Sequence, residues 1–195
     1  MDRERELAYI RRVLDGDPEP FAELVRSYQN LVASVAYRMG VPRHTIEDVT
    51  SEVFMKAYTH LGSYDPQWAF STWLYRIATN HVLDEIKRKK KEGTVAISQV
   101  SEPADPRPSA QGEAEVTERD RLVRGCLSEL PEEYQRVLVL KHFEDLPVSE
   151  IARALAIPEG TVKIRLMRGR IRLRKILEAR HPEHFPALPS AGEDA

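Results

Sequence analysis

Apolar residues recur at helical spacing along most of the chain, and no segment shows the strict alternation of a half-buried strand. One such pattern starts at Phe21 and continues for about five turns, with Pro20 at its start and Gly40 directly after its end. A second pattern follows Thr45, a residue suited to cap a helix N-terminus, and reaches Leu61. The sequence predicts an all-α protein.

A third helical pattern, from Ser71 to about Lys90, has apolar residues on two sides. Trp73 and Ile77 lie on one side, and Val82 and Ile86 lie on the other. A helix that is apolar on two sides can be buried on both, so we expect this helix at the centre of its bundle.

The later part of the chain predicts four more helices, and the last two form a helix-turn-helix. The four lie near 118–128, from Pro131 onwards, at about 148–155 and up to about 179. The connection between the last two is Ala156-Ile157-Pro158. Ala156 stands where such turns usually carry glycine, and a left-handed alanine costs about 1 kcal/mol.

Two segments lack the large apolar residues that a folded core needs. Residues 92–117 contain several prolines and are predicted to form a flexible acidic linker, and the tail, 181–195, is predicted to be disordered. We therefore expect two small helical domains, 5–91 and 118–180.

Composition excludes several classes of protein. The chain has 195 residues, of which 42% are hydrophobic and 31% charged, and no apolar run is long enough for a secretory signal or an integral membrane segment. Its single cysteine, Cys126, excludes an internal disulfide framework and a zinc site of several thiolates. No phosphate-binding glycine loop or nucleophile elbow is present. We predict a cytoplasmic protein with no catalytic residue, no metal and no cofactor; an enzyme is the weaker alternative.

The formal net charge of −2 conceals a strong asymmetry along the chain. Residues 1–91 carry +1, residues 92–117 carry −4, residues 118–180 carry +4, and the tail carries −3. The positive charge is concentrated in the run 87–91 and in seven Lys and Arg residues between positions 163 and 175. Two basic patches with an acidic connector predict an extended anionic partner such as nucleic acid, although each patch alone could be a solvated helix face.

The last helix has an unusual outward face. On a helical wheel its core face carries Val162, Leu166, Gly169, Leu173 and Ile176. The opposite face carries Ile164, Met167 and Ile171, with Lys163, Arg170 and Arg174 on one side and Arg165, Arg168, Arg172 and Lys175 on the other. Such a face suits the DNA major groove, where apolar groups touch thymine methyls, arginine reads guanine and other cations bind phosphates. The alternative is an apolar patch that docks on a helix of another protein.

A set of motifs occurs in order along both predicted domains. They are Phe21-Ala-Glu-Leu-Val-Arg-Ser-Tyr-Gln29; Glu47-Asp48, Glu52-Val-Phe54 and Ala57-Tyr58; Phe70 to Asn80 with Asp84 and Arg88; Leu130-Pro131; Glu150-Ile151-Ala152; and Gly160-Thr-Val-Lys163 with Arg165, Arg168 and Arg170. In this set the chain resembles the extracytoplasmic-function sigma factors, the small promoter-recognition subunits of bacterial RNA polymerase. The resemblance covers about residues 20–90 and 118–178.

The resemblance implies a function for each domain. Residues 5–91 would be a sigma region 2-like domain that binds core polymerase and then recognises and melts the minus-ten element. Residues 118–180 would be a region 4-like helix-turn-helix domain that reads the minus-thirty-five element. The implied partners are core RNA polymerase (its beta and beta-prime subunits), promoter DNA and an anti-sigma factor.

The same resemblance implies three groups of site residues. The polymerase-binding residues are Asp48, Ser51, Glu52 and Met55. The minus-ten residues are Trp68, Asn80, Lys87 and Arg88. The minus-thirty-five residues are Lys163, Ile164, Arg165, Met167, Arg168 and Arg172.

Some of these residues have a second interpretation. Trp68 could stack on a flipped base or cap the core beside Phe70. Arg88 could pair with Asp84, four residues earlier, instead of reading a base. Ile164 stands where the family often has serine, which predicts a different base preference at one promoter position. A free-standing helix-turn-helix regulator is the rival class, and it would not support initiation by core polymerase alone.

Overall fold

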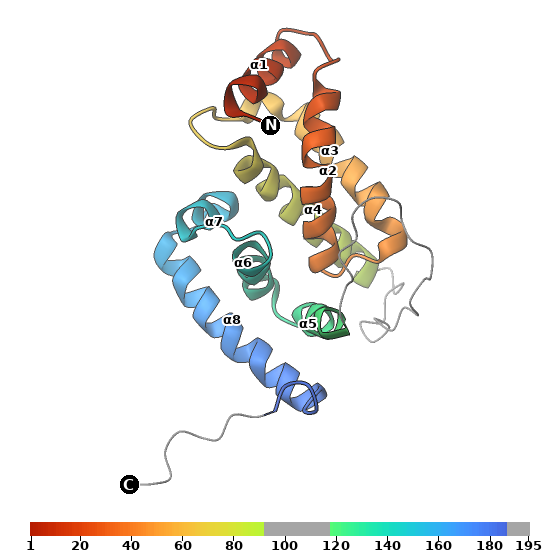
Figure 1. Ribbon diagram of the computed structural model, residues 1–195, viewed down its shortest axis with the longest axis vertical. Coiled ribbons are helices and arrows are strands. Elements are labelled where there is room, and N and C mark those ends of the chain that lie inside the picture. Colours follow the sequence, from red (N-terminus) through yellow and green to blue (C-terminus); the bar gives the residue numbers. More distant parts are fainter. Residues whose placement is uncertain (92–117, 187–195) are drawn as a thin grey trace.

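The computed structural model describes residues 1–91 and 118–186, and its secondary structure within these ranges is helical, as predicted (Figure 1). The first half contains α1 (Arg3–Leu14), α2 (Phe21–Arg38), α3 (Ile46–Thr59) and α4 (Phe70–Lys91), with 3-10 turns at Arg43–Thr45 and Leu61–Ser63. The second half contains α5 (Glu118–Leu127), α6 (Glu132–His142), α7 (Val148–Leu155) and α8 (Glu159–Arg180). The predicted linker, 92–117, and residues 187–195 of the predicted tail lie outside the described residues.

Helix α4 lies at the centre of the molecule, with α2 and α3 against one side and α7 against another (Figure 1). Phe70, Leu74, Ala78 and Val82 are fully buried along it. Its two apolar sides therefore pack against helices of both halves, which explains its central place.

Helix α1 has no counterpart in the sequence prediction. Asp2 caps it by accepting the Arg5 backbone N–H at 2.9 Å. Ile10 and Val13 are buried, and the buried carboxylate of Glu6 accepts a hydrogen bond from the hydroxyl of Tyr28 on α2. The apolar stripe of α1 is narrow and interrupted by charges, so this helix depends on its packing against α2 more than on a strong local pattern.

The N-terminus of α3 differs from its prediction. Thr45 directly precedes the helix, but its hydroxyl donates to the carbonyl of Pro42 at 3.0 Å and does not cap α3. The 3-10 turn Arg43–Thr45 leads directly into α3, and Thr45 itself has near-helical dihedral angles (φ −110°, ψ 0°). A capping residue needs an extended backbone, so the prediction of a Thr45 cap is wrong.

The helix-turn-helix is formed as the sequence predicted. Helix α7 ends at Ala156, which has left-handed dihedral angles (φ 54°, ψ 46°), and Pro158 then precedes α8. Helix α8 packs on α6 at Gly169, where an added Cβ would lie only 3.2 Å from atoms of Leu138 and Tyr134. Glycine at this position lets the two helix backbones approach closely and fixes which side of α8 faces outward.

The two halves are packed against each other, a contact that the sequence pattern does not indicate. The carboxylate of Glu144 accepts hydrogen bonds from Ser34 Oγ at 2.7 Å and from the Tyr75 hydroxyl at 2.8 Å. The buried Gln135 side chain donates to the backbone carbonyl of Met39 at 3.1 Å. Burial, and then the Glu144 carboxylate, raise the pKa of Tyr75, so that this hydroxyl remains a hydrogen-bond donor. Buried apolar residues of both halves also belong to one cluster, so the interface is partly polar and partly apolar.

Candidate functional site

The outward face of α8 is apolar along its centre. Ile164, Met167 and Ile171 are 49%, 55% and 51% exposed, whereas Val162 and Leu166 on the opposite face are buried. The structure therefore places the two faces of this helix as the helical wheel predicts.

The cations around this face fall into two sets. All of these cations except Arg165 are exposed; the first set is Lys163, Arg168 and Lys175, and Arg168 lies beside the apolar centre, four residues after Ile164. The remaining arginines turn towards neighbouring groups: Arg165 lies 3.3 Å from Glu133, Arg170 donates to His142 at 3.2 Å, Arg172 lies 5.1 Å from the ring centroid of Tyr134, and Arg174 donates to Glu178 at 2.6 Å. Two of the predicted DNA-binding residues, Arg165 and Arg172, thus have partners on α6.

The predicted polymerase-binding residues form one exposed stripe on α3. Asp48, Ser51, Glu52 and Met55 are all exposed, and Met55 is 61% exposed. The opposite side of the helix, which includes Val53, is buried against α2 and α4. The sequence pattern of α3 therefore decides which side chains reach a partner.

A buried histidine on α4 lies directly under this stripe and close to two side chains of α3. His81 is 4% exposed; its Nδ1 lies 2.8 Å from the Lys56 ammonium, and its Nε2 lies 3.0 Å from the Glu52 carboxylate. Burial, followed by the nearby charge of Lys56, lowers the pKa of His81, so the ring is neutral and accepts from Lys56 through Nδ1. The proton then resides on Nε2, which lies near Glu52 but forms no hydrogen bond of normal geometry with it. The sequence shows only that His81 lies on a core face; its two polar neighbours come from another helix.

Three of the four predicted minus-ten residues are held by the second half. The guanidinium carbon of Arg153 lies 3.2 Å from the ring centroid of Trp68. Arg136 Nη1 donates to Asn80 Oδ1 at 2.9 Å, and the carboxylate of Glu132 lies 3.0 Å from the Lys87 ammonium. These three partners lie on α6 and α7, and neither their spacing nor their type indicated this role in the sequence.

The structure also bears on the alternative roles considered for Trp68, as a cap on the core, and for Arg88, as the ion-pair partner of Asp84. Trp68 is 37% exposed and stacks against Arg153, so it is not a buried cap on the core beside Phe70. Arg88, the fourth predicted minus-ten residue, forms an ion pair with Glu85 at 2.8 Å, at i,i+3 spacing.

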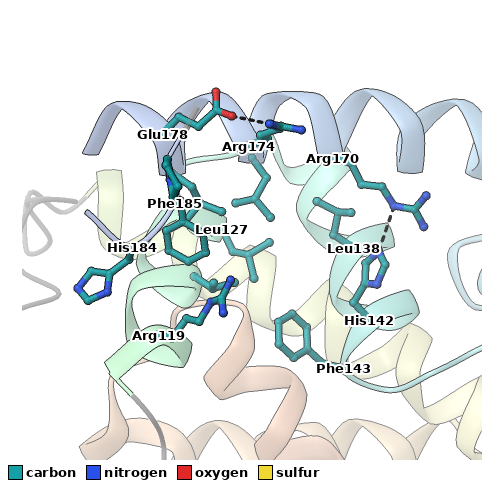
Figure 2. Close-up of a pocket in the computed structure, with 14 residues that line it drawn as sticks. Arg119, Leu127, Leu138, His142, Phe143, Arg170, Arg174, Glu178, His184 and Phe185 are labelled. Carbon is teal, nitrogen blue, oxygen red and sulfur yellow. Dashed lines mark hydrogen bonds and ion pairs between the residues drawn. The ribbon is translucent and has the colours of Figure 1, made fainter. Parts of the chain in front are cut away.

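The second half also contains a pocket of about 620 Å³ between α5, α6 and α8 (Figure 2). Leu127 and Leu138 line its apolar floor. Residues 181–186, which the sequence assigns to the tail, turn back here, and Phe185 lies with its ring centroid 5.0 Å from the Arg119 guanidinium. An apolar floor of this size suits a protein segment better than a nucleic acid.

The described residues contain no cluster of three or more His, Cys, Asp or Glu side chains that could hold a metal ion. None of the helices in these ranges is both long and apolar enough to cross a membrane.

Comparison with known families matches each half separately. Residues 24–92 match Sigma-70 region 2, and residues 120–173 match Sigma-70, region 4. The first match covers most of α2 and all of α3 and α4, and the second covers most of α5 to α8.

Relatives align over most of the chain. The chain is 36% identical over 176 residues to the ECF RNA polymerase sigma factor SigW of Bacillus subtilis (strain 168), which covers 86% of this chain and 94% of that protein. It is 33% identical over 176 residues to the ECF RNA polymerase sigma-E factor of Escherichia coli (strain K12), and the alignment covers 83% of this chain and 88% of that protein. Among solved structures, CnrH in complex with the cytosolic domain of CnrY has a similar fold, with a TM-score of 0.63, 22% identity, and 92% and 99% of the two chains covered.

A helical bundle followed by a helix-turn-helix with a basic second helix defines a class of DNA-binding transcription proteins. Within that class, the chain belongs to the sigma-70 family, in its extracytoplasmic-function group. It is a transcription initiation factor and not an enzyme: it directs core RNA polymerase to promoters.

Proposed function

We propose that this sigma factor binds core polymerase through the exposed stripe of α3, the minus-ten element through α4 and the minus-thirty-five element through α8. The domains are 5–91 and 118–180, with 92–117 as their linker. The observation that carries the proposal is the exposed, cation-flanked face of α8 behind a left-handed turn. Helices α3 and α8 lie at opposite sides of the molecule, so a polymerase and an upstream DNA element could engage them together (Figure 1).

The α3 stripe supplies both charge and apolar contact for polymerase. Asp48 and Glu52 offer carboxylates to a basic partner, Ser51 adds a hydroxyl, and the exposed Met55 side chain adds adaptable apolar area. His81 acts as a positioning residue, because it packs directly under the stripe with its Nε2 3.0 Å from the Glu52 carboxylate and its Nδ1 2.8 Å from the Lys56 ammonium.

The chemistry around the minus-ten residues supports a nucleic-acid role. The planar guanidinium of Arg153 lies over the Trp68 ring, in the place that an unstacked base could take. The Glu132 carboxylate lies beside the Lys87 ammonium, in the place that a phosphate could take. Asn80 has its amide oxygen occupied by Arg136. All three residues are exposed, but their partners on α6 and α7 occupy the groups that would contact a promoter, so these contacts must break before those groups can bind DNA. We therefore propose that the two halves separate when the protein joins polymerase and DNA.

On α8, the residues divide into readers and supports. Ile164, Met167 and Arg168 lie on the exposed face and would reach base edges, while Lys163 flanks them at the helix N-terminal side. Arg165 and Arg172 hold α8 against α6 and reach phosphates from there.

Regulation by an anti-sigma factor in the cytoplasm is part of the proposal. CnrH has been solved in complex with the cytosolic domain of CnrY, and the sigma factor RpoE of Bartonella quintana has been solved in complex with the anti-sigma factor NepR. The pocket beneath Phe185 offers an apolar docking place for a protein segment of this kind.

The test is transcription with purified core polymerase on a promoter library randomised at both elements. We expect this protein alone to convert core polymerase into a promoter-selective enzyme. A free-standing regulator would instead bind duplex DNA tightly without polymerase and leave core polymerase unable to initiate selectively. That result would refute the proposal.

A further inference from the structure

Three exposed apolar side chains form one line on α8. Ile164, Met167 and Ile171 occupy positions i, i+3 and i+7, and each has about half of its surface exposed. Single exposed apolar residues are ordinary on protein surfaces, but a continuous line of them usually marks a binding surface.

The surroundings of this line indicate the chemistry of its partner. Arg168 lies between Ile164 and Ile171, and the exposed Lys163 and Lys175 lie at the two ends. An apolar protein helix would have to bury these cations without paired anions, which is costly. A DNA major groove instead offers phosphates to the cations and, at every thymine, an exposed methyl group to an apolar side chain.

The spacing along the helix fits successive base pairs. At 1.5 Å per residue, Ile164 and Met167 are about 4.5 Å apart along the axis, between one and two of the 3.4 Å steps between base pairs, so the two side chains can reach adjacent base pairs. Ile164 is the sixth residue of α8, and the N-terminal part of a recognition helix is the part that approaches base edges. Ile171 lies about two turns further on, towards the groove edge.

We propose that Ile164 and Met167 read the methyl groups of thymines at two neighbouring base pairs of the minus-thirty-five element. The inference rests on the proposed function of α8 and adds which chemical group of the DNA bases this helix recognises. Ile164 has no hydrogen-bonding group and the Met167 thioether is only a weak acceptor, so the thymine methyl is the feature of the major groove that these side chains contact best.

The test removes single methyl groups from the DNA. The promoter selected most strongly from the library is rebuilt with deoxyuridine in place of each thymine of its minus-thirty-five element, one at a time, and transcribed by the reconstituted holoenzyme. We expect two neighbouring positions at which the loss of one methyl lowers initiation about fourfold, which corresponds to about 0.8 kcal/mol per buried carbon group.

Variants assign each position to a side chain. Ile164→Ala should abolish the deoxyuridine effect at one position and keep it at the other, and Met167→Ala should do the reverse. Leu14→Ala, which truncates a side chain that is 53% exposed on α1, is the matched control and should keep both effects. All three positions are exposed, so the variants should bind core polymerase like the parent.

The outcomes separate this inference from the proposed function. Selective transcription without any deoxyuridine effect, or a selected element without thymine at neighbouring positions, would overturn thymine reading and leave the sigma function intact. Unchanged promoter choice in both variants, with loss of binding to another protein, would assign the line to protein docking. Failure of the parent protein to support selective transcription would refute the proposed function itself.

Discussion

The contact between the two halves makes a quantitative prediction about access to the minus-ten residues. The perturbation is the double variant Arg136→Ala and Arg153→Ala, which removes the groups that hold Asn80 and Trp68. The Arg136 hydrogen bond contributes about 1.5 kcal/mol, as expected for a charged donor. The stacking of Arg153 on a partly exposed tryptophan adds about 0.5 kcal/mol. Together they favour the packed arrangement by about 2 kcal/mol, or about 30-fold.

The assay is the binding of the free protein to a fluorescent single strand that carries the selected minus-ten sequence. If only the separated form binds, the apparent dissociation constant of the protein is inversely proportional to the population of that form. The double variant should therefore bind up to about 30-fold more tightly. Tighter binding by the double variant is the informative result, because the removal of two positive charges would by itself weaken binding to DNA.

A matched control removes the same charge elsewhere. Arg11→Ala with Arg121→Ala truncates two exposed arginines, on α1 and α5, and should bind the strand no more tightly than the parent. Urea unfolding of each protein checks that both halves remain folded. Unchanged or weaker binding by the Arg136 and Arg153 variant, with both halves folded, would refute the idea that these contacts mask the minus-ten face.

Three further predictions concern single residues. Asp48→Lys should weaken binding to core polymerase about tenfold or more in fluorescence titrations, whereas Glu4→Lys on α1 should not, because only the first reverses charge on the α3 stripe. The pKa of His81 is lowered in the folded state, so on acidification the unfolded chain takes up a proton at this residue first. The free energy of unfolding should therefore fall as the pH drops below about 6.5. In urea unfolding at several pH values, His81→Gln should reduce that fall. Arg168→Ala should relax preference at one base pair of the minus-thirty-five element, with a cost of about 1–3 kcal/mol, whereas Arg174→Ala should weaken all promoters alike and reduce the salt dependence by about one unit. The reverse pattern in single-base-pair promoter series would show that the two roles are exchanged.

Local sequence alone determined the helices that carry the candidate site. The two-sided apolar pattern of α4 is enough to predict a central helix, and the spacing along α8 is enough to separate Val162 from Ile164. The turn at Ala156 was also predictable, because a short helix, the connection Ala156-Ile157-Pro158 and a basic second helix together are typical of a helix-turn-helix. These features depend on residues within a few positions of one another, so periodicity and turn chemistry specify them.

The tertiary structure decided which polar groups meet. Asn80 and Arg136 are 56 residues apart, and Tyr75 and Glu144 are 69 residues apart, so no local pattern relates them. Helix α1 likewise shows too little apolar surface in its own sequence and is fixed by packing on α2. The sequence therefore proposed side chains for binding polymerase and DNA, and only the tertiary structure showed that Trp68, Asn80 and Lys87 have partners on α6 and α7. Burial and ion pairing depend on the neighbours that the folded chain brings within a few ångströms, and those neighbours come from distant parts of the chain.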